Sequence, residues 1–263
     1  MNKSKVYSLI VTICTQHDKE VNAMNDRVWQ TGSLFVGILT DDAFTNCYIV
    51  KDEASGQVFV VDPYWIDLPL EELCQNGISE SSGVVAFITH LHPDHCEGVI
   101  DLRAEGYSVT ALAHERVATV LKVLSEDGGV DRICEQYNAK MFRGEIELMV
   151  GIRPEGLADG SSNHPHLGQV VTFCGEGHSP ADSVLFLPEG LGCAFVGDLL
   201  AFDGTDVLFG RTDFPGGNRD KLMATVDRAL ALLPDNCLIC PGHNEPFQLT
   251  NAVREMIKEQ LGE

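Results

Sequence analysis

The stretch Thr89-His90-Leu91-His92-Pro93-Asp94-His95 places four potential metal ligands within six consecutive residues. It follows the apolar run 84–88, so the histidines are expected where a buried strand passes into a loop. Isolated histidines are often ordinary surface or core residues, but chance rarely places three of them with an aspartate at a strand end. Imidazole and carboxylate together suit Zn, Fe or Mn better than the all-oxygen sites of Ca or Mg. The stretch therefore predicts a transition-metal site.

The spacing within this stretch favours two ions over one. His90 and His92 are two residues apart and can converge on a single ion. Pro93 fixes its own backbone φ and keeps the loop stiff. Asp94 and His95 lie beyond that proline, so they can turn toward a second ion.

More possible ligands follow strand-like apolar runs later in the chain. These ligands are His178, Asp198 and His243, and each has a glycine directly before it. Glycine allows the backbone to turn sharply or to come close to a ligand cluster. A rigid metal site needs ligands at the ends of several buried strands, because metal geometry tolerates little slack. A dinuclear site is therefore expected.

In these motifs the chain resembles the metallo-β-lactamase superfamily, over a match that runs from about Asn46 to His243. The residues that match its metal signature, in order, are His90, His92, Asp94, His95, His178, Asp198 and His243. The resemblance implies an α/β fold, the αβ/βα four-layer sandwich. It implies a first metal held by His90, His92 and His178. It also implies a second metal held by Asp94, His95 and His243, with Asp198 bridging the two.

Asp62 matches the aspartate that precedes the signature at the end of an early strand. The resemblance implies that it supports the ligands from behind. Its position directly before Pro63 is equally typical of a turn residue, so both interpretations stay open.

The segment Phe209–Gly217 narrows the resemblance to two related groups. Its Gly-Arg-Thr-Asp-Phe letters are similar to short hydroxyacylglutathione hydrolase-like (type II glyoxalase-like) enzymes and to persulfide dioxygenases. The Pro-Gly-Gly ending resembles the hydrolase-like group more closely. Arg211 can pair with a substrate carboxylate in bidentate fashion, or with Asp213 to anchor the loop. We expect an anchoring role for Asp213 and leave both roles of Arg211 open.

Composition limits the partners. The chain has 18 Lys and Arg against 39 Asp and Glu, for a formal net charge of −21 at pH 7. An acidic surface repels phosphate backbones, which argues against a nucleic-acid partner. Glutathione conjugates are anionic as well, so one would need a local basic patch that the composition does not indicate.

Neither a membrane span nor a disulfide framework is indicated. No run of eighteen apolar residues is present, and the apolar stretch Val6–Cys14 is too short and interrupted for a secretory signal. Nine cysteines scattered through apolar runs favour free thiols in a reducing cytoplasm. We read Cys237 and Cys240 as part of a strand and not as a redox motif.

Hydrophobic periodicity predicts strand-rich and then alternating structure in one domain, 1–263. The expected strands are Tyr7–Cys14, Ser33–Leu39, Asn46–Val50, Val58–Asp62, Ser108–Ala113, Val170–Cys174, Ser183–Leu187, Cys193–Val196 and Cys237–Cys240. The expected helices are Leu68–Gln75, Cys96–Ala104, His114–Leu124, Asp220–Leu233 and Phe247–Leu261. An insertion at about 125–168 is expected to be a lid, a dimer contact or a surface loop. His164 and His166 lie in it, outside the signature, and we expect no third metal there.

These observations favour a metal-dependent hydrolase that cleaves a thioester, or a related ester or lactone, of a small molecule. A hydroxide bridging two Zn ions, with its pKa lowered to about 7, would attack the carbonyl carbon. Asp94 would orient it and handle a proton. One alternative is a persulfide dioxygenase with one Fe held by His90, His178 and Asp198, and mixed Fe, Zn or Mn occupancy is open. A non-catalytic scaffold is a further alternative, and a homodimer is an open possibility.

Overall fold

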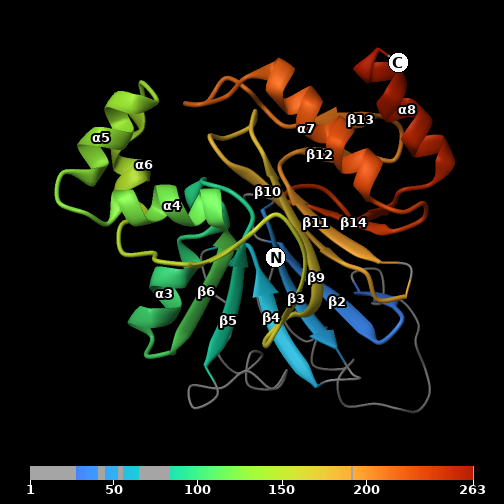
Figure 1. Ribbon diagram of the computed structural model, residues 1–263, viewed down its shortest axis with the longest axis horizontal. Coiled ribbons are helices and arrows are strands. Elements are labelled where there is room, and N and C mark those ends of the chain that lie inside the picture. Colours follow the sequence, from blue (N-terminus) through green and yellow to red (C-terminus); the bar gives the residue numbers. More distant parts are fainter. Residues whose placement is uncertain (1–27, 41–44, 53–55, 65–82, 191, 263) are drawn as a thin grey trace, which may run out of the picture.

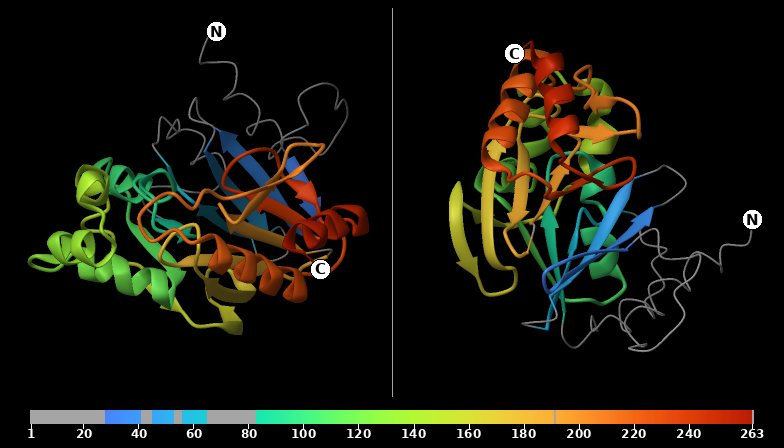
Figure 2. Two further views of the ribbon diagram at one scale, coloured as in Figure 1. Left: turned by 90° about the horizontal axis from the view of Figure 1, so that it is seen from above. Right: turned by 90° about the vertical axis from the view of Figure 1, so that its right-hand side faces the viewer.

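Two β-sheets lie face to face in the middle of the molecule, with helices on the outer side of each (Figure 1). The computed structural model describes residues 28–40, 45–52, 56–64, 83–190 and 192–262. Views at right angles show the same layers (Figure 2). The order helix, sheet, sheet, helix confirms the predicted αβ/βα four-layer sandwich.

The first sheet has seven strands in chain order. They are β1 Val28–Thr31, β2 Leu34–Thr40, β3 Asn46–Asp52, β4 Gln57–Val61, β5 Val84–Ile88, β6 Val109–His114 and β7 Glu155–Leu157. The strands β1 to β4 are antiparallel neighbours, whereas β4, β5, β6 and β7 run parallel. Because parallel strands end at the same edge, the segments after β4 and β5 emerge side by side.

The second sheet has six strands in the order β15-β14-β11-β10-β9-β8. They are β8 Gly160–His164, β9 Gly168–Gly175, β10 Asp182–Leu187, β11 Cys193–Gly197, β14 Leu238–Pro241 and β15 Phe247–Gln248. A separate two-stranded ribbon joins β12 Leu200–Phe202 to β13 Val207–Phe209. β11 and β14 are parallel neighbours, so the segments after them also share one edge.

The helices cover the outer faces in two groups. The first group is α3 Gly98–Ala104, α4 Glu115–Leu124, α5 Gly129–Gln136 and α6 Arg143–Leu148, with the short 3₁₀ turns η2 Pro93–His95 and η3 Lys140–Phe142. The second is α7 Arg219–Leu232 and α8 Asn251–Leu261. Side chains of Asn218 and Thr250 cap α7 and α8 by accepting backbone N–H groups of their first turns.

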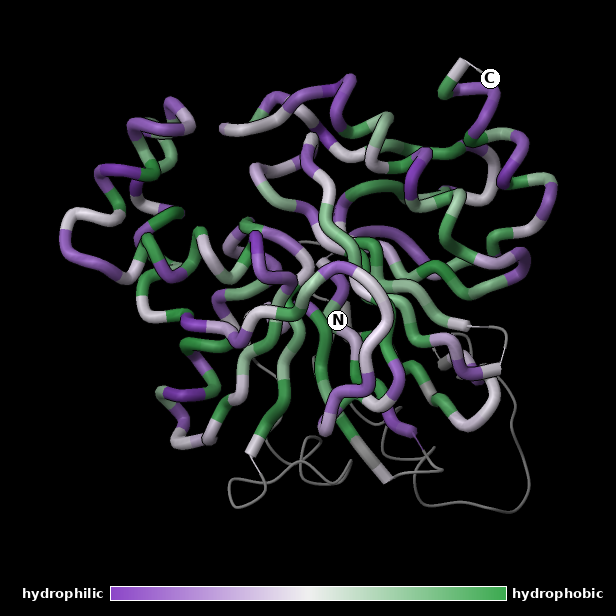
Figure 3. The backbone as a smooth tube through the Cα atoms, in the orientation of Figure 1, coloured by the Kyte–Doolittle hydropathy of each residue, from purple (hydrophilic) through white to green (hydrophobic). Residues whose placement is uncertain are grey.

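Three apolar clusters fill the three interfaces between the four layers. β5 shows how one strand serves two of them. Val84, Ala86 and Ile88 belong to the cluster beneath the first helices, whereas Val85 and Phe87 face the second sheet. Alternation along a strand sends neighbouring side chains to opposite faces, which explains the uninterrupted apolar run. Apolar residues accordingly follow the central strands, and hydrophilic residues alternate with them along the outer helices (Figure 3).

Most predicted elements are present with small shifts at their ends. The predicted helix 247–261 is wrong at its start, because Phe247–Gln248 pairs with β14 as strand β15 and the helix begins only after its cap at Thr250. The segment 125–168 holds the helices α5 and α6 and the strands β7 and β8. The expected strand Tyr7–Cys14 and helix Leu68–Gln75 lie outside the described residues.

In the described part of the chain, none of the helices has the length and apolar character needed to cross a membrane. Seven cysteines there are buried and form no disulfide with one another.

Candidate metal centre

Five chain segments bring polar side chains to one edge of the two sheets. Asp62 follows β4, and the stretch Thr89 to His95 follows β5 and ends in the turn η2. From the second sheet come His178 after β9, Asp198 after β11 and His243 after β14. Only the pairing of distant strands gathers these residues at one place.

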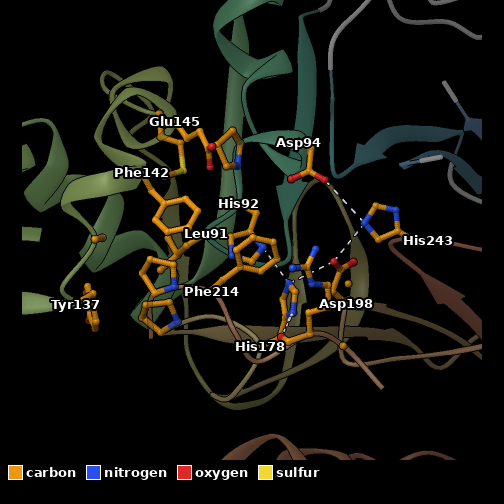
Figure 4. A pocket seen from close by; sticks show the side chains of 18 of the residues that line it. Leu91, His92, Asp94, Tyr137, Phe142, Glu145, His178, Asp198, Phe214 and His243 are labelled. Carbon is orange, nitrogen blue, oxygen red and sulfur yellow. Dashed lines mark hydrogen bonds and ion pairs between the residues drawn. The ribbon is translucent and has the colours of Figure 1, made fainter. Parts of the chain in front are cut away.

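The first group of converging atoms belongs to His90, His92, His178 and Asp198, whose candidate ligand atoms all lie within 4.8 Å of one another. Nδ1 of His92 is 3.1 Å from Nε2 of His90 and 2.9 Å from Nε2 of His178. Nε2 of His178 is 3.2 Å from Oδ2 of Asp198. The three histidines expected to share an ion therefore lie together, and Figure 4 shows His92 and His178 beside Asp198.

The second group is Asp94, His95 and His243. Oδ2 of Asp94 lies 3.5 Å from Nε2 of His95 and 3.8 Å from Nε2 of His243. Asp198, a member of the first group, also lies close to the second. Its Oδ1 is 3.4 Å from His95 Nε2, and its Oδ2 is 3.3 Å from His243 Nε2. One carboxylate thus reaches histidines of both groups.

Two buried polar atoms of the cluster have no hydrogen-bond partner among the described residues. They are Nε2 of His95 and Oδ1 of Asp198. Leaving a buried polar atom without a partner is costly, and such atoms are uncommon in folded proteins. A set of imidazole nitrogens and carboxylate oxygens with unused lone pairs fits a transition-metal ion.

Contacts behind the cluster aim the ring nitrogens inward. Asp62 accepts hydrogen bonds from the backbone N–H and the hydroxyl of Thr89, at 2.8 and 2.7 Å, and its Oδ2 lies 3.0 Å from Nδ1 of His95. Nδ1 of His178 lies 2.8 Å from the carbonyl oxygen of Arg211. A partner on Nδ1 leaves Nε2 of each ring for the cluster. Asp62, His90 and His95 also come close as a third group, but Asp62 faces the Nδ1 side of His95.

Burial and neighbouring charges set the protonation of these groups. Burial, together with His95, holds the pKa of His90 well below its usual range, and burial with His178 lowers the pKa of His92 to about 3. Burial also disfavours charge on His95, but Asp198 and Asp62 outweigh it and raise its pKa to about 10. Burial likewise opposes charge on Asp198, yet His95 and His178 hold its pKa well below the usual range. His95 and Asp198 thus form an ion pair beside the neutral rings of His90 and His92.

Close backbone approach explains a glycine beside the cluster. A Cβ atom on Gly242 would overlap Oδ1 of Asp198 and meet Cε1 of His95 at 2.5 Å. The position before His243 therefore requires glycine because a side chain would not fit there, and not because the backbone turns.

Two side chains that hold the His243 loop were not predicted from the sequence. Asn46 donates to the carbonyl oxygens of Pro241 and Asn244 at 3.0 and 2.6 Å, and the Tyr48 hydroxyl donates to Pro241 at 2.5 Å. Both side chains are buried. Asn46 and Tyr48, which stand among the apolar residues of the expected strand Asn46–Val50, were the available signal.

A buried carboxylate fixes the His178 loop in a similar way. Asp182 accepts the backbone N–H groups of His178 and Ser179, each at 2.9 Å. Burial raises the pKa of Asp182 to about 6, although His178 and these hydrogen bonds oppose the rise. Asp182 is the first residue of β10, at the end of the strand that faces the His178 loop.

The segment after β13 carries Arg211, Asp213 and Phe214. The Arg211 guanidinium forms two hydrogen bonds to Asp213, at 2.9 and 2.6 Å, and lies over the Phe214 ring at 4.4 Å. Both charged side chains are exposed. This geometry matches the alternative in which Arg211 pairs with Asp213 to anchor the loop.

His164 and His166 lie at the end of β8, and neither belongs to a group of possible metal ligands found among the described residues.

A cavity of about 450 Å³ opens on the cluster. Asp94, Asp198 and His243 line it, together with residues of α4, α5, η3 and α6. Part of the segment 125–168 therefore forms a wall of the cavity, where the Phe142 ring lies edge-on to Phe214 (Figure 4).

Residues 40–243 match the family model described as Metallo-beta-lactamase superfamily. The chain belongs to this superfamily. It is 38% identical over 215 residues to "Persulfide dioxygenase ETHE1, mitochondrial" of Mus musculus, covering 80% of this chain and 68% of that protein. It is 29% identical over 160 residues to "Probable metallo-hydrolase YqgX" of Bacillus subtilis strain 168, covering 59% of this chain and 66% of that protein.

Solved structures share the fold. One is TTHA1623 in a di-iron-bound form, with a TM-score of 0.55 and 24% identity, covering 81% of this chain and 94% of that one. At this level of sequence identity, the similarity supports the shared fold and nothing further.

Proposed function

We propose that the protein is a dinuclear metallo-hydrolase that cleaves a thioester, or a related ester or lactone. The observation that carries this proposal is the position of Asp198. Its Oδ1 lies 3.4 Å from His95 Nε2, and its Oδ2 lies 3.2 Å from His178 Nε2 and 3.3 Å from His243 Nε2. A carboxylate placed between two ligand groups is suited to bridge two ions.

We assign one ion to His90, His92 and His178 and the other to Asp94, His95 and His243, with Asp198 shared. When bound, two Zn ions supply Lewis acidity for the carbonyl and a nucleophilic hydroxide near neutral pH. The residues behind the ligands keep this geometry rigid, since Asp62 orients His95 and the carbonyl of Arg211 orients His178.

Asp94 is the catalytic residue in this proposal. It is 37% exposed, lines the cavity, and its Oδ2 is held by the Thr45 hydroxyl at 3.2 Å. From this position it can orient the attacking oxygen and take up a proton. The oxygen adds to the acyl carbon, the carbon–sulfur bond breaks, and the thiol leaves with a proton from the water. No oxidant or reductant takes part in this hydrolysis.

The identity to the mouse persulfide dioxygenase favours a second candidate, a mononuclear iron dioxygenase. His90, His178 and Asp198 supply the two imidazoles and one carboxylate that such a site uses. The same ligand set can serve either candidate, and the position of Asp198 between two ligand groups favours the hydrolase. The similarity to a probable metallo-hydrolase also supports it.

Metal content per chain, measured on protein purified without added metal, is the experiment that separates these candidates. Two ions per chain with metal-dependent cleavage of a thioester panel would support the hydrolase. One Fe per chain with oxygen uptake on glutathione persulfide would overturn it in favour of the dioxygenase. Absence of metal even after reconstitution would leave the scaffold alternative. A protein of the same fold has been solved with two irons, so the element must be determined as well as the count.

A further inference from the structure

The cavity continues well past the metal cluster, and beyond the cluster its lining is mainly apolar. Ile133, Tyr137, Phe142, Ile146 and Met149 line it from the segment between α4 and β7. Ile133, Ile146 and Met149 are buried, and Tyr137 and Phe142 pack against the same core. The wall is therefore held in place by the core of the first layer.

An aromatic series joins this wall to the metal cluster. The Phe214 ring lies edge-on to His92, with centroids 5.2 Å apart, and edge-on to Phe142 at 6.0 Å. Apolar surface is thus continuous from a proposed metal ligand to η3, as the close view shows (Figure 4). A chain or ring attached next to the scissile bond would remain in contact with apolar atoms along this path.

The charges along the cavity oppose an anionic ligand. Outside the metal cluster, the charged side chains among the described lining residues are Arg211 and Glu145. Arg211 already makes two hydrogen bonds to Asp213. Glu145 is exposed on α6 and contributes a negative charge at the wall. A substrate carboxylate would have to displace Asp213 from Arg211 and would meet repulsion from Glu145.

We infer that the substrate carries an uncharged apolar chain or ring that occupies this cavity, and that anionic conjugates such as glutathione thioesters are poor substrates. The inference rests on the proposed hydrolase function and names its substrate class. The segment 125–168 is then the specificity-determining wall of the site.

A series of substrates tests the chain-length dependence. Acyl thioesters of N-acetylcysteamine, with acyl chains from acetyl to decanoyl, should show kcat/KM rising about fourfold for each methylene until the cavity is full. Acetyl thioesters of alkanethiols of matched length decide which side of the scissile bond carries the chain. Succinyl and glutathione thioesters should fall at least tenfold below neutral ones. A flat profile in both series would overturn the inference while leaving the hydrolase proposal intact.

Matched variants test the wall itself. Phe142→Ala should lower kcat/KM for long acyl chains more than for acetyl and so flatten the chain-length profile, and Phe142→Leu should restore most of it. Met141→Ala is the control, because Met141 is 95% exposed and does not line the cavity. Glu145→Gln should raise kcat/KM for the succinyl thioester several-fold. Glu147→Gln removes the same charge from a position of α6 that does not line the cavity, and should change nothing. Equal effects in variants and controls would overturn the role of the wall.

A binding measurement separates this inference from the proposed reaction. Uncleavable S-alkyl thioethers should bind with affinity that rises with chain length, and the rise should disappear in Phe142→Ala. If binding rises in this way but no thioester is hydrolysed, the cavity assignment stands and the hydrolase proposal fails. If affinity is independent of chain length, the cavity assignment fails.

Discussion

Nδ1 of His95 lies 3.0 Å from Oδ2 of Asp62, and the two side chains are 0% and 2% exposed. The contact leaves Nε2 as the ring nitrogen that faces Asp94 and Asp198. A carboxylate behind a histidine fixes its tautomer and makes it a better ligand. Asp62 thus acts on the proposed second ion through His95.

Asp62→Asn should weaken binding of the second ion about 10- to 100-fold and leave the first nearly unchanged. The amide presents an N–H₂ group or a weaker acceptor to Nδ1, so His95 is held less firmly. Competition titration with a chromophoric Zn chelator measures both affinities. Asp227→Asn, on the exposed side of α7, should change neither. Unaltered affinity in Asp62→Asn would refute the supporting role.

Gly242→Ala should also disturb the second ion, for a steric reason. The new Cβ atom would overlap Oδ1 of Asp198 and press on His95, so one of them has to move. We expect the metal content to fall toward one ion per chain and kcat to drop at least tenfold. Elemental analysis and steady-state kinetics measure the two effects.

Gly144→Ala is the matched control for this substitution. Gly144 lies in α6, its φ is not positive, and a Cβ atom added there would have no atom within 4 Å. Alanine should stabilise the helix there by up to about 1 kcal/mol and leave metal content unchanged. Full metal content in Gly242→Ala as well would contradict this prediction, because it would show that the loop accommodates the new Cβ atom and still binds both ions.

Tyr48→Phe and Asn46→Ala form a graded pair at the His243 loop. Removing the Tyr48 hydroxyl leaves the Pro241 carbonyl bonded to Asn46, so the free energy of unfolding should fall by about 1 kcal/mol with both ions retained. Asn46→Ala removes donors to Pro241 and Asn244, and should cost about 2 to 3 kcal/mol and weaken the second ion. Urea unfolding with metal analysis tests this order, and the reverse order would contradict it.

Asp94→Asn should lower kcat on a thioester about 10²- to 10⁴-fold, because the amide cannot accept a proton. The amide keeps an oxygen that the Thr45 hydroxyl can still reach, so the fold should be preserved. Stopped-flow kinetics, with the metal content of each sample measured beside it, separate lost chemistry from a lost ion. Full activity with two ions bound would exclude Asp94 as the proton acceptor.

Buried thiols should make the protein sensitive to alkali. Burial raises the pKa of the thiols of Cys47, Cys174 and Cys237 to about 12, from a usual value of 9.0. The unfolded chain then loses these protons first. Their contribution to stability is complete below about pH 9 and is lost as the pH rises from about 9 through about 12. Urea midpoints across this range should fall steadily.

The same burial should protect these thiols from alkylation in the folded protein. Iodoacetamide at pH 8.5 should label them only after unfolding, as peptide mapping of each cysteine would show. Rapid labelling of Cys47 in the folded protein would contradict the burial.

Local patterns in the sequence determined the ligand types and their order, and the resemblance that these motifs carry implied the layer architecture. The stretch His90 to His95 identifies a metal loop because its residue types and spacing are themselves the chemistry. The run Val84 to Ile88 predicts a strand buried on both faces, since a strand between two layers needs apolar side chains on each side. The residues that make up such a signal lie close together in the sequence, so the signal can be recognised without knowledge of the fold.

Tertiary structure alone decided which partners those residues have and what surrounds them. The support of Asn46 for the His243 loop joins residues almost 200 positions apart, and strand pairing at long range carries no local signature. The helices α5 and α6 were expected only as an insertion of open role, because the sequence does not state which face packs against what. Their apolar residues become a cavity wall only when packing places them opposite Phe214, and burial in that packing also sets the protonation of the histidines.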